Sequence, residues 1–157
     1  MKKRGGRFLK ALTSFIILSI IVIAVSSYLI NKTHLIIGIA FLGLGIINLI
    51  FLKIFKIEMK SIYPDLVFGI IDNGVLVFAA ILGGYFAGIM GAVIGGVAGN
   101  TITDGLGGLF EGRLAEKQRK KNIKTHRTTL STTLGKMAGC LFGAGIGLII
   151  IWLIGLF

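Results

Sequence analysis

The chain from Asp65 to Glu111 reads DLVFGIIDNGVLVFAAILGGYFAGIMGAVIGGVAGNTITDGLGGLFE. After Asp65, this stretch belongs to an apolar run of 47 residues, Leu66 to Gly112, that is rich in glycine. About 20 apolar residues cross the hydrocarbon core of a bilayer as a helix, so this run is too long for one crossing. Gly83, Gly84 and the segment from Gly88 to Gly91 are candidate breaks. We therefore expect two helices, about 66–87 and 92–112, with a turn near Gly88 to Gly91.

The composition of the whole chain indicates a membrane protein. Of its 157 residues, 55% are hydrophobic and only 15% are charged, which is more apolar surface than one soluble domain of this length can bury. The single cysteine, Cys140, cannot form an intramolecular disulfide, and we assign it no role. The fold class expected is therefore an all-α, polytopic integral membrane protein.

Three further apolar runs are long enough to span a bilayer. They cover residues 12–30, 34–55 and 134–157, which brings the expected number of transmembrane helices to five. The first run is longer than the apolar core of a typical signal peptide and no clear small-residue cleavage site ends it, so we interpret it as a transmembrane helix.

The basic residues predict the orientation of these five helices. Sixteen of the 17 Lys and Arg residues fall on one side of the membrane, and only Lys32 falls on the other. The positive-inside rule then places the N-terminus in the cytoplasm and the C-terminus outside. We expect the membrane to be the cytoplasmic membrane of a prokaryote. We interpret the net charge of +11 as a topology signal and not as a sign of nucleic-acid binding. The basic cytoplasmic segment can also attract anionic lipid headgroups, or its charges can simply orient and solubilise the chain.

The sequence divides into four parts. Residues 1–55 form a hairpin rich in Ile and Leu, with Asn48 as its only strongly polar interior residue, and we interpret this hairpin as scaffold. Residues 56–112 form the glycine-rich hairpin, residues 113–133 a basic cytoplasmic connection, and residues 134–157 the last helix. Small residues at every fourth position let helices approach closely. The chain has two such ridges, which are Gly91, Gly95 and Gly99, and Gly139, Gly143 and Gly147.

The acids of the glycine-rich hairpin are its candidate functional residues, because a carboxylate in hydrocarbon is costly. With the turn centred at Gly88, Asp72 and Asp104 are each 16 residues from it, which places both about 24 Å from the turn, toward the cytoplasm. The same arithmetic pairs Asp65 with Glu111. Helical spacing places Asn100, Asp104 and Glu111 on one side of the second helix. We call the set Asp72, Asn73, Asn100, Asp104 and Glu111 the polar seam.

The polar seam offers the oxygen ligands that hard cations prefer. It can bind a divalent metal, with Asp72 and Asp104 as the candidate ligands, or exchange a coupling proton, since two close carboxylates compete for one. Alternatively, these groups cap helix breaks, hydrogen-bond between helices or neutralise a nearby Lys or Arg. We expect Thr101 and Thr103 to bond to the backbone.

Two segments of the hairpin resemble the first two helices of the vacuolar iron and manganese transporter family. They are Asp72-Asn-Gly-Val-Leu-Val-Phe-Ala-Ala-Ile-Leu-Gly-Gly and Gly99-Asn-Thr-Ile-Thr-Asp-Gly-Leu-Gly-Gly-Leu-Phe-Glu111. The resemblance implies metal binding by Asp72 and Asp104 and proton-driven export of ferrous or manganous ions. The family has Asn-Asp where this chain has Asp72-Asn73, a Met at the position of Gly108, and a Glu-rich segment where this chain is basic.

These features favour a small membrane transporter or channel subunit that moves an ion or small solute past Asp72 and Asp104. So short a chain has few helices to enclose a path, so we expect a homo-oligomer or a membrane partner subunit. The alternative is a non-transporting scaffold, assembly factor or accessory subunit that packs through its glycine-rich helices. We find no enzyme motif and expect no cofactor, with a divalent cation as substrate at most. His34 and His126 are expected in loops on opposite sides of the membrane.

Overall fold

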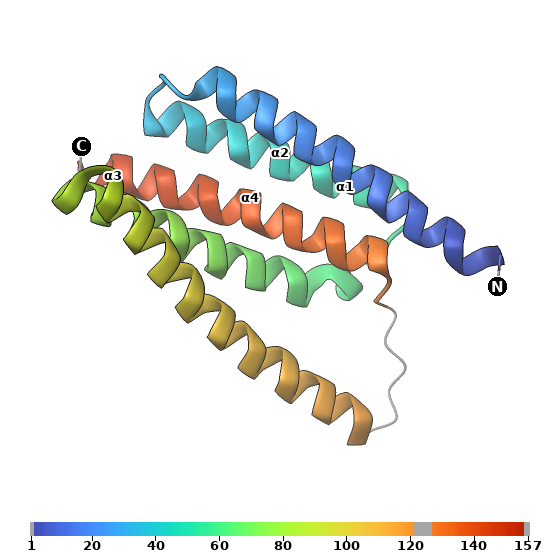
Figure 1. Cartoon of the computed structure of the whole chain (residues 1–157). Coiled ribbons are helices and arrows are strands. Elements are labelled where there is room, and N and C mark those ends of the chain that lie inside the picture. The colour runs from blue at the N-terminus through green and yellow to red at the C-terminus, as the bar shows by residue number, and fades with distance from the viewer. Residues whose placement is uncertain (1, 121–126, 156–157) are drawn as a thin grey trace.

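The structure is a computed structural model that describes residues 2–120 and 127–155. Its elements are α1 (Lys2–Leu29), α2 (His34–Ile54), α3 (Met59–Lys120) and α4 (Thr129–Leu153), shown in Figure 1. The part of the chain that is described is thus all helical outside short loops. Each of the four helices is long and apolar enough to cross a membrane.

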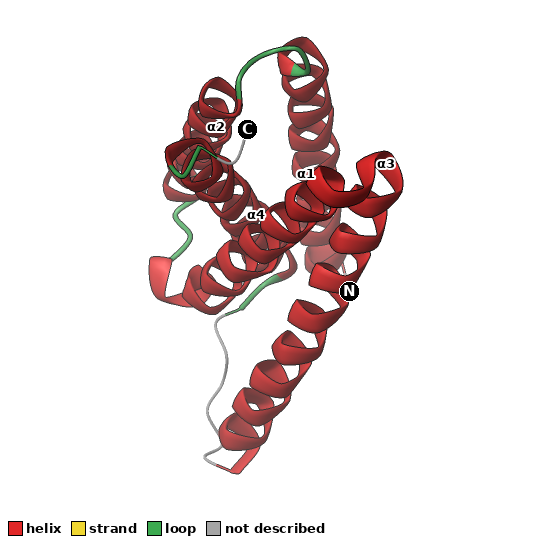
Figure 2. Ribbon diagram, turned by 90° about the vertical axis from the view of Figure 1, so that its left-hand side faces the viewer, coloured by secondary structure: helices red, strands yellow, loops and turns green. Residues whose placement is uncertain are grey.

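α3 is folded back on itself. Its helical path is interrupted at Ala87 (φ −139°, ψ 23°) and Gly88 (φ 61°, ψ −145°). The positive φ of Gly88 is strained for residues with a Cβ, which explains a glycine at this turn. We call residues 59–86 the first half of α3 and residues 89–120 its second half. The second half returns in the opposite direction and diverges from the other helices toward its end, as Figures 1 and 2 show.

α4 is the centre of the bundle. It packs against α3 and α2 most extensively and against α1 less, and Figure 1 shows it between α2 and the first half of α3. Leu134, Ala138 and Ile151 of α4 are almost completely buried. Leu134 joins Leu52 of α2 in a buried cluster that also contains Leu18 and Ile62.

Both glycine ridges pack inside one chain. A Cβ on Gly91, Gly95 or Gly99 would meet the first half of α3, at Gly83, Ala79 and Val75 to Ala79 respectively. A Cβ on Gly139 or Gly143 would meet Leu66 or Ile70 of the first half of α3, and Gly147 lies over Gly74 and Val77. The glycines therefore allow close backbone-to-backbone packing between the two halves of α3 and between α3 and α4.

The helix ends differ from the sequence-based bounds in several places. α1 begins at Lys2 and not near residue 12. α3 begins at Met59 and not near residue 66, and its second half continues to Lys120. α4 begins at Thr129, five residues before the expected start at 134, because Thr128 and Ser131 form a reciprocal capping box. Residues 121–126, which include His126, and residues 156–157 at the end of the expected last helix lie outside the described residues.

Candidate functional site

Asp72 is joined to the second half of α3 by Thr103. The Thr103 hydroxyl donates to Asp72 Oδ1 and is also within hydrogen-bonding distance of the carbonyl oxygens of Gly99 (3.0 Å) and Asn100 (3.1 Å). Thr103 is only 2% exposed. The bond to backbone expected for Thr103 is thus present, together with a bond to a carboxylate that the sequence did not suggest.

The position of the turn explains why Thr103 and not Asp104 meets Asp72. The facing pairs Gly83 with Gly91, Ala79 with Gly95 and Phe68 with Gly107 are centred at residue 87 or between 87 and 88. This centre is slightly earlier than Gly88. A shift of one residue rotates a helical side chain by about 100°, so Thr103 points inward and Asp104 does not.

Asp104 lies on the open side of the second half of α3. Its Oδ2 accepts a 2.9 Å hydrogen bond from Asn100 Nδ2, one helical turn away, and this pair is exposed. Thr101 is exposed as well and donates to the Val97 carbonyl oxygen at 2.8 Å. The structure therefore brings Asn100 and Asp104 together and places Asp72 against a different residue.

Asp65 forms a buried ion pair with Arg127. The Asp65 side chain is fully buried and the Arg127 side chain is 26% exposed. Asp65 Oδ1 accepts the bond from Arg127, whereas Asp65 Oδ2 is buried with no hydrogen-bond partner among the described residues. This pair ties the first part of α3 to the segment just before α4, because Arg127 lies two residues before Thr129.

Glu111 is paired with Lys136. Lys136 Nζ lies 3.3 Å from Glu111 Oε1, and both side chains are partly exposed. The same ammonium lies 5.1 Å from the centre of the Phe68 ring, within the range of a cation–π interaction. Gly135, the neighbour of Lys136, packs against the Asp65 side chain. The two ion pairs thus form one charged layer across α3 and α4.

Asn73 lines a groove. This groove has a volume of about 450 Å³ and is also lined by residues of α1, α2 and α4, among them Ser19, Phe41, Lys136 and Cys140. The five residues of the polar seam therefore lie in different settings. Asp72 lies between the two halves of α3, and Asn73 lies in the groove. Asn100 and Asp104 lie on the open side, and Glu111 lies in the charged layer.

The described residues hold no group of three or more His, Cys, Asp and Glu side chains that is able to bind a metal. Within a single chain, a metal at Asp104 would have only Asn100 as a second side-chain ligand from the polar seam.

Sequence reasoning missed three interacting residues: Thr103, Arg127 and Lys136. The signal for Thr103 was present, because a centre between Ala87 and Gly88 would have paired it with Asp72. Arg127 and Lys136 were counted only for topology, and their carboxylate partners follow from the packing of α4 on α3. In comparisons with protein-family models, curated proteins and solved structures, nothing matches this chain.

Proposed function

We propose that this chain is a subunit of an oligomeric membrane transporter or channel that moves an ion or a small solute along the open side of α3. The observation that carries the proposal is the exposed Asn100–Asp104 pair inside a segment apolar enough to span a membrane. A carboxylate facing lipid is costly. A water-filled path between subunits removes that cost.

The open side of the second half of α3 also has room for a second copy. A Cβ on Gly105, Gly108 or Gly112 would meet nothing within 4 Å. These glycines recur at intervals of three and four residues, so they share one helix face, next to Asp104. Packing of two copies through this face would bring two Asn100–Asp104 pairs together around one path.

The topology proposed has five crossings. The two halves of α3 cross separately, which accounts for the fold at Ala87 and Gly88. With an N-terminus in the cytoplasm, the C-terminus lies outside, and the basic residues from Arg113 to Arg127 face the cytoplasm. There they can also bind anionic lipid headgroups. We infer the cytoplasmic membrane of a prokaryote as the location.

A divalent metal ion is the first candidate substrate. The resemblance of residues 72–111 to the vacuolar iron and manganese transporters suggests it. Two Asn100–Asp104 pairs at a subunit interface would supply four side-chain ligands, where one chain supplies two. The proposed metal ligand therefore is Asp104 from each copy. Asp72 is not a ligand in this proposal, but it binds Thr103, the residue next to Asp104, and so helps to position this part of the helix.

The test is flux through reconstituted vesicles. Purified protein is placed in liposomes that contain a metal-sensitive dye, and entry of Mn²⁺ and of K⁺ is measured with and without a proton gradient. We expect Asp104→Asn, alone or with Asp72→Asn, to abolish the flux. Glu116→Gln is the matched control, because Glu116 is an exposed acid near the end of the same helix, and it should leave flux unchanged. A double variant as fast as the wild type, or a wild type no faster than empty vesicles, would refute the proposal.

A scaffold or accessory subunit is the second candidate. The observation that favours it is that three acids already have partners inside the chain, since Asp65 pairs with Arg127, Glu111 with Lys136 and Asp72 with Thr103. Under this proposal Asp104→Asn changes the amount of assembled complex and not the passage of any ion. Co-purification of partner subunits with wild-type and variant chains separates the two candidates.

A further inference from the structure

One oxygen of the charged layer has no partner. Asp65 Oδ1 accepts a hydrogen bond from Arg127, whereas Asp65 Oδ2 is buried and accepts none from the described residues. A buried acceptor without a donor is unfavourable, and the cost is larger when the group is charged. A second donor at Asp65 Oδ2 would therefore stabilise the layer.

Lys136 is a donor beside Asp65. A Cβ on the preceding residue, Gly135, would lie 3.2 Å from Asp65 Cβ. The Lys136 ammonium lies 5.1 Å from the centre of the Phe68 ring, and Phe68 is one helical turn from Asp65 on the same side of α3. A lysine side chain has a flexible four-carbon stem and three N–H donors. Rotation of this stem can carry the ammonium from Glu111 to Asp65.

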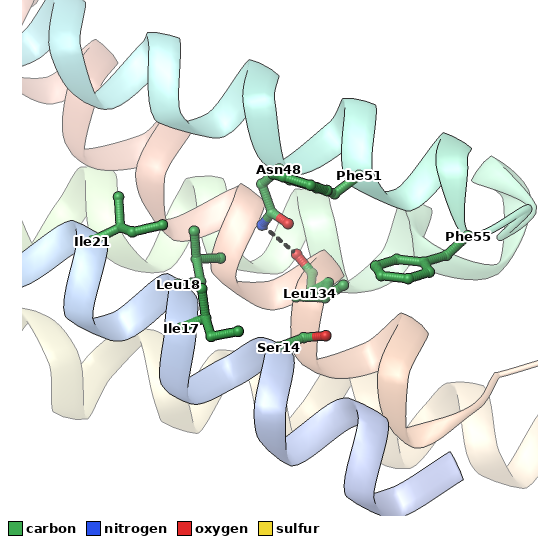
Figure 3. Close-up of a pocket in the computed structure, with 8 residues that line it drawn as sticks. All are labelled: Ser14, Ile17, Leu18, Ile21, Asn48, Phe51, Phe55 and Leu134. Carbon is green, nitrogen blue, oxygen red and sulfur yellow. Dashed lines mark hydrogen bonds between the residues drawn. The ribbon is translucent and has the colours of Figure 1, made fainter. Parts of the chain in front are cut away.

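The backbone that carries Lys136 is fixed at this level of the bundle. Figure 3 shows the 3.0 Å hydrogen bond from Asn48 Nδ2 of α2 to the carbonyl oxygen of Leu134, two residues before Lys136. Asn48 is 1% exposed and Leu134 is 3% exposed, so water does not compete for this bond. A change of partner at Lys136 is therefore a rotation of its side chain and not a movement of α4.

The second half of α3 is held more weakly toward its end than near the turn. Gly95 and Gly99 pack closely against the first half, and beyond them the second half diverges from the other helices, as Figures 1 and 2 show. The 3.3 Å ion pair between Glu111 and Lys136 joins this diverging part to α4. Both side chains are partly exposed, and such pairs contribute little to stability. Loss of the pair would release the end of the second half.

We propose that Lys136 is the moving part of a switch with two states. In the closed state, which is the one in this structure, Lys136 pairs with Glu111 and holds the second half of α3 against α4. In the open state Lys136 donates to Asp65 Oδ2, Glu111 faces water, and the end of the second half moves away. The ammonium only changes carboxylate, so no proton is gained or lost.

The switch bears on the site proposed for ion passage, because Asn100 and Asp104 lie on the same second half of α3. In this respect it rests on the proposed function. Its test measures distances within one chain and not flux, so failure of the switch and failure of the transport proposal are separate results.

The experiment measures the distance between spin labels on the two halves of α3. Cys140 is replaced by alanine, and cysteines for the labels replace Lys60 and Lys120, two exposed residues outside the charged layer. The labelled full chain in detergent is diluted with unlabelled chain, so that pulsed electron paramagnetic resonance records distances within one chain. We expect a short distance for the closed state and a long one for the open state. A single distance that no variant changes would overturn the proposal.

Two variants should change the populations in opposite directions. Glu111→Gln removes the closed pair and should raise the ratio of long to short distances about two- to fivefold. Asp65→Asn removes the charge that attracts Lys136 in the open state and should lower this ratio about tenfold. If the two ion pairs only stabilise the fold, both variants loosen it and both raise the ratio, and the switch is refuted.

Glu116→Gln is the matched control, because Glu116 is an exposed acid on the same helix, and it should leave the ratio unchanged. An effect as large as that of Glu111→Gln would contradict the assignment of Glu111. If Asp65→Asn fails to fold, the double variant Asp65→Asn with Arg127→Gln supplies the same test, because it leaves no buried charge without a partner.

Salt provides a second measurement on the unchanged layer. Salt screens exposed charges more than buried ones, so it should weaken the Glu111–Lys136 pair and raise the ratio of long to short distances. The same salt should have little effect on Glu111→Gln, which lacks the exposed pair. A ratio that does not depend on salt when the layer is intact would show that this pair does not hold the closed state.

Discussion

Replacing Arg127 by glutamine should destabilise the protein strongly, although Arg127 lies outside the helices. The substitution leaves the fully buried Asp65 carboxylate without its cation, and Asp65 Oδ2 already has no partner among the described residues. Removing one member of a buried ion pair costs about 3–5 kcal/mol. Because the Arg127 side chain is 26% exposed, water reaches the pair, so we expect the lower end, about 3 kcal/mol.

The other variants of this pair follow from the same geometry. Asp65→Asn leaves a guanidinium that can turn toward water, so it should cost only about 1.5 kcal/mol. The double variant Asp65→Asn with Arg127→Gln should be more stable than Arg127→Gln alone, because no charge then remains buried without a partner. Glu111→Gln is the control, because it breaks an ion pair whose side chains are 48% and 41% exposed. It should cost less than about 1 kcal/mol.

The measurement is the free energy of unfolding of the purified chain in mixed micelles, as a function of the mole fraction of SDS. Loss of helix is followed by circular dichroism. The reasoning is refuted if Arg127→Gln is within about 1 kcal/mol of the wild type. Strictly additive effects of the Asp65 and Arg127 substitutions would refute it as well, because they would mean that the two charges do not interact.

Three more predictions concern α3. Thr103→Val should lower the free energy of unfolding by about 1.5–3 kcal/mol, because it removes the hydrogen bond that Thr103 donates to Asp72. Thr101→Val removes only an exposed bond to the backbone and should have little effect. Equal losses for the two variants would contradict this assignment. Gly95→Ala should prevent close packing of the two halves of α3 and unfold at a lower SDS fraction, because its Cβ would collide with the Ala79 backbone. At Gly105 an added Cβ has nothing within 4 Å. Gly105→Ala should therefore stabilise a single chain by up to about 1 kcal/mol, because alanine favours the helix more than glycine does. A loss of stability at Gly105 as large as that at Gly95 would be inconsistent with this structure. Gly105→Leu should reduce the molecular mass of the purified complex measured by light scattering, and an unchanged mass would exclude this face as the contact between copies.

The fold of the glycine-rich hairpin was largely predictable from sequence. A run of 47 apolar residues is too long for one crossing, and the turn was expected near Gly88 to Gly91; the structure places it at Ala87 and Gly88. The start of α4 was harder to predict. Its first residues are polar, which favours a loop, but the capping box of Thr128 and Ser131 begins the helix there.

The partners of the acids were not predictable in the same way. Depth along a helix follows from counting residues at about 1.5 Å each, and an error of one residue changes depth little. The same error rotates a side chain by about 100°, which is enough to exchange Asp104 for Thr103 as the neighbour of Asp72. Counting along the chain thus predicts depth more reliably than contact.

By itself, the sequence of this protein determined its all-helical class, the positions of its apolar runs and the residues that are costly to place in a membrane, because these depend on composition and on runs of adjacent residues. Only the tertiary structure decided which of those residues meet. It paired Asp65 with Arg127, 62 residues away, and Asn48 with Leu134, 86 residues away, and it left Asn100 and Asp104 on an open face. Such pairings depend on how each helix is rotated about its axis against its neighbours, and that rotation is set by the packing of glycine faces between helices.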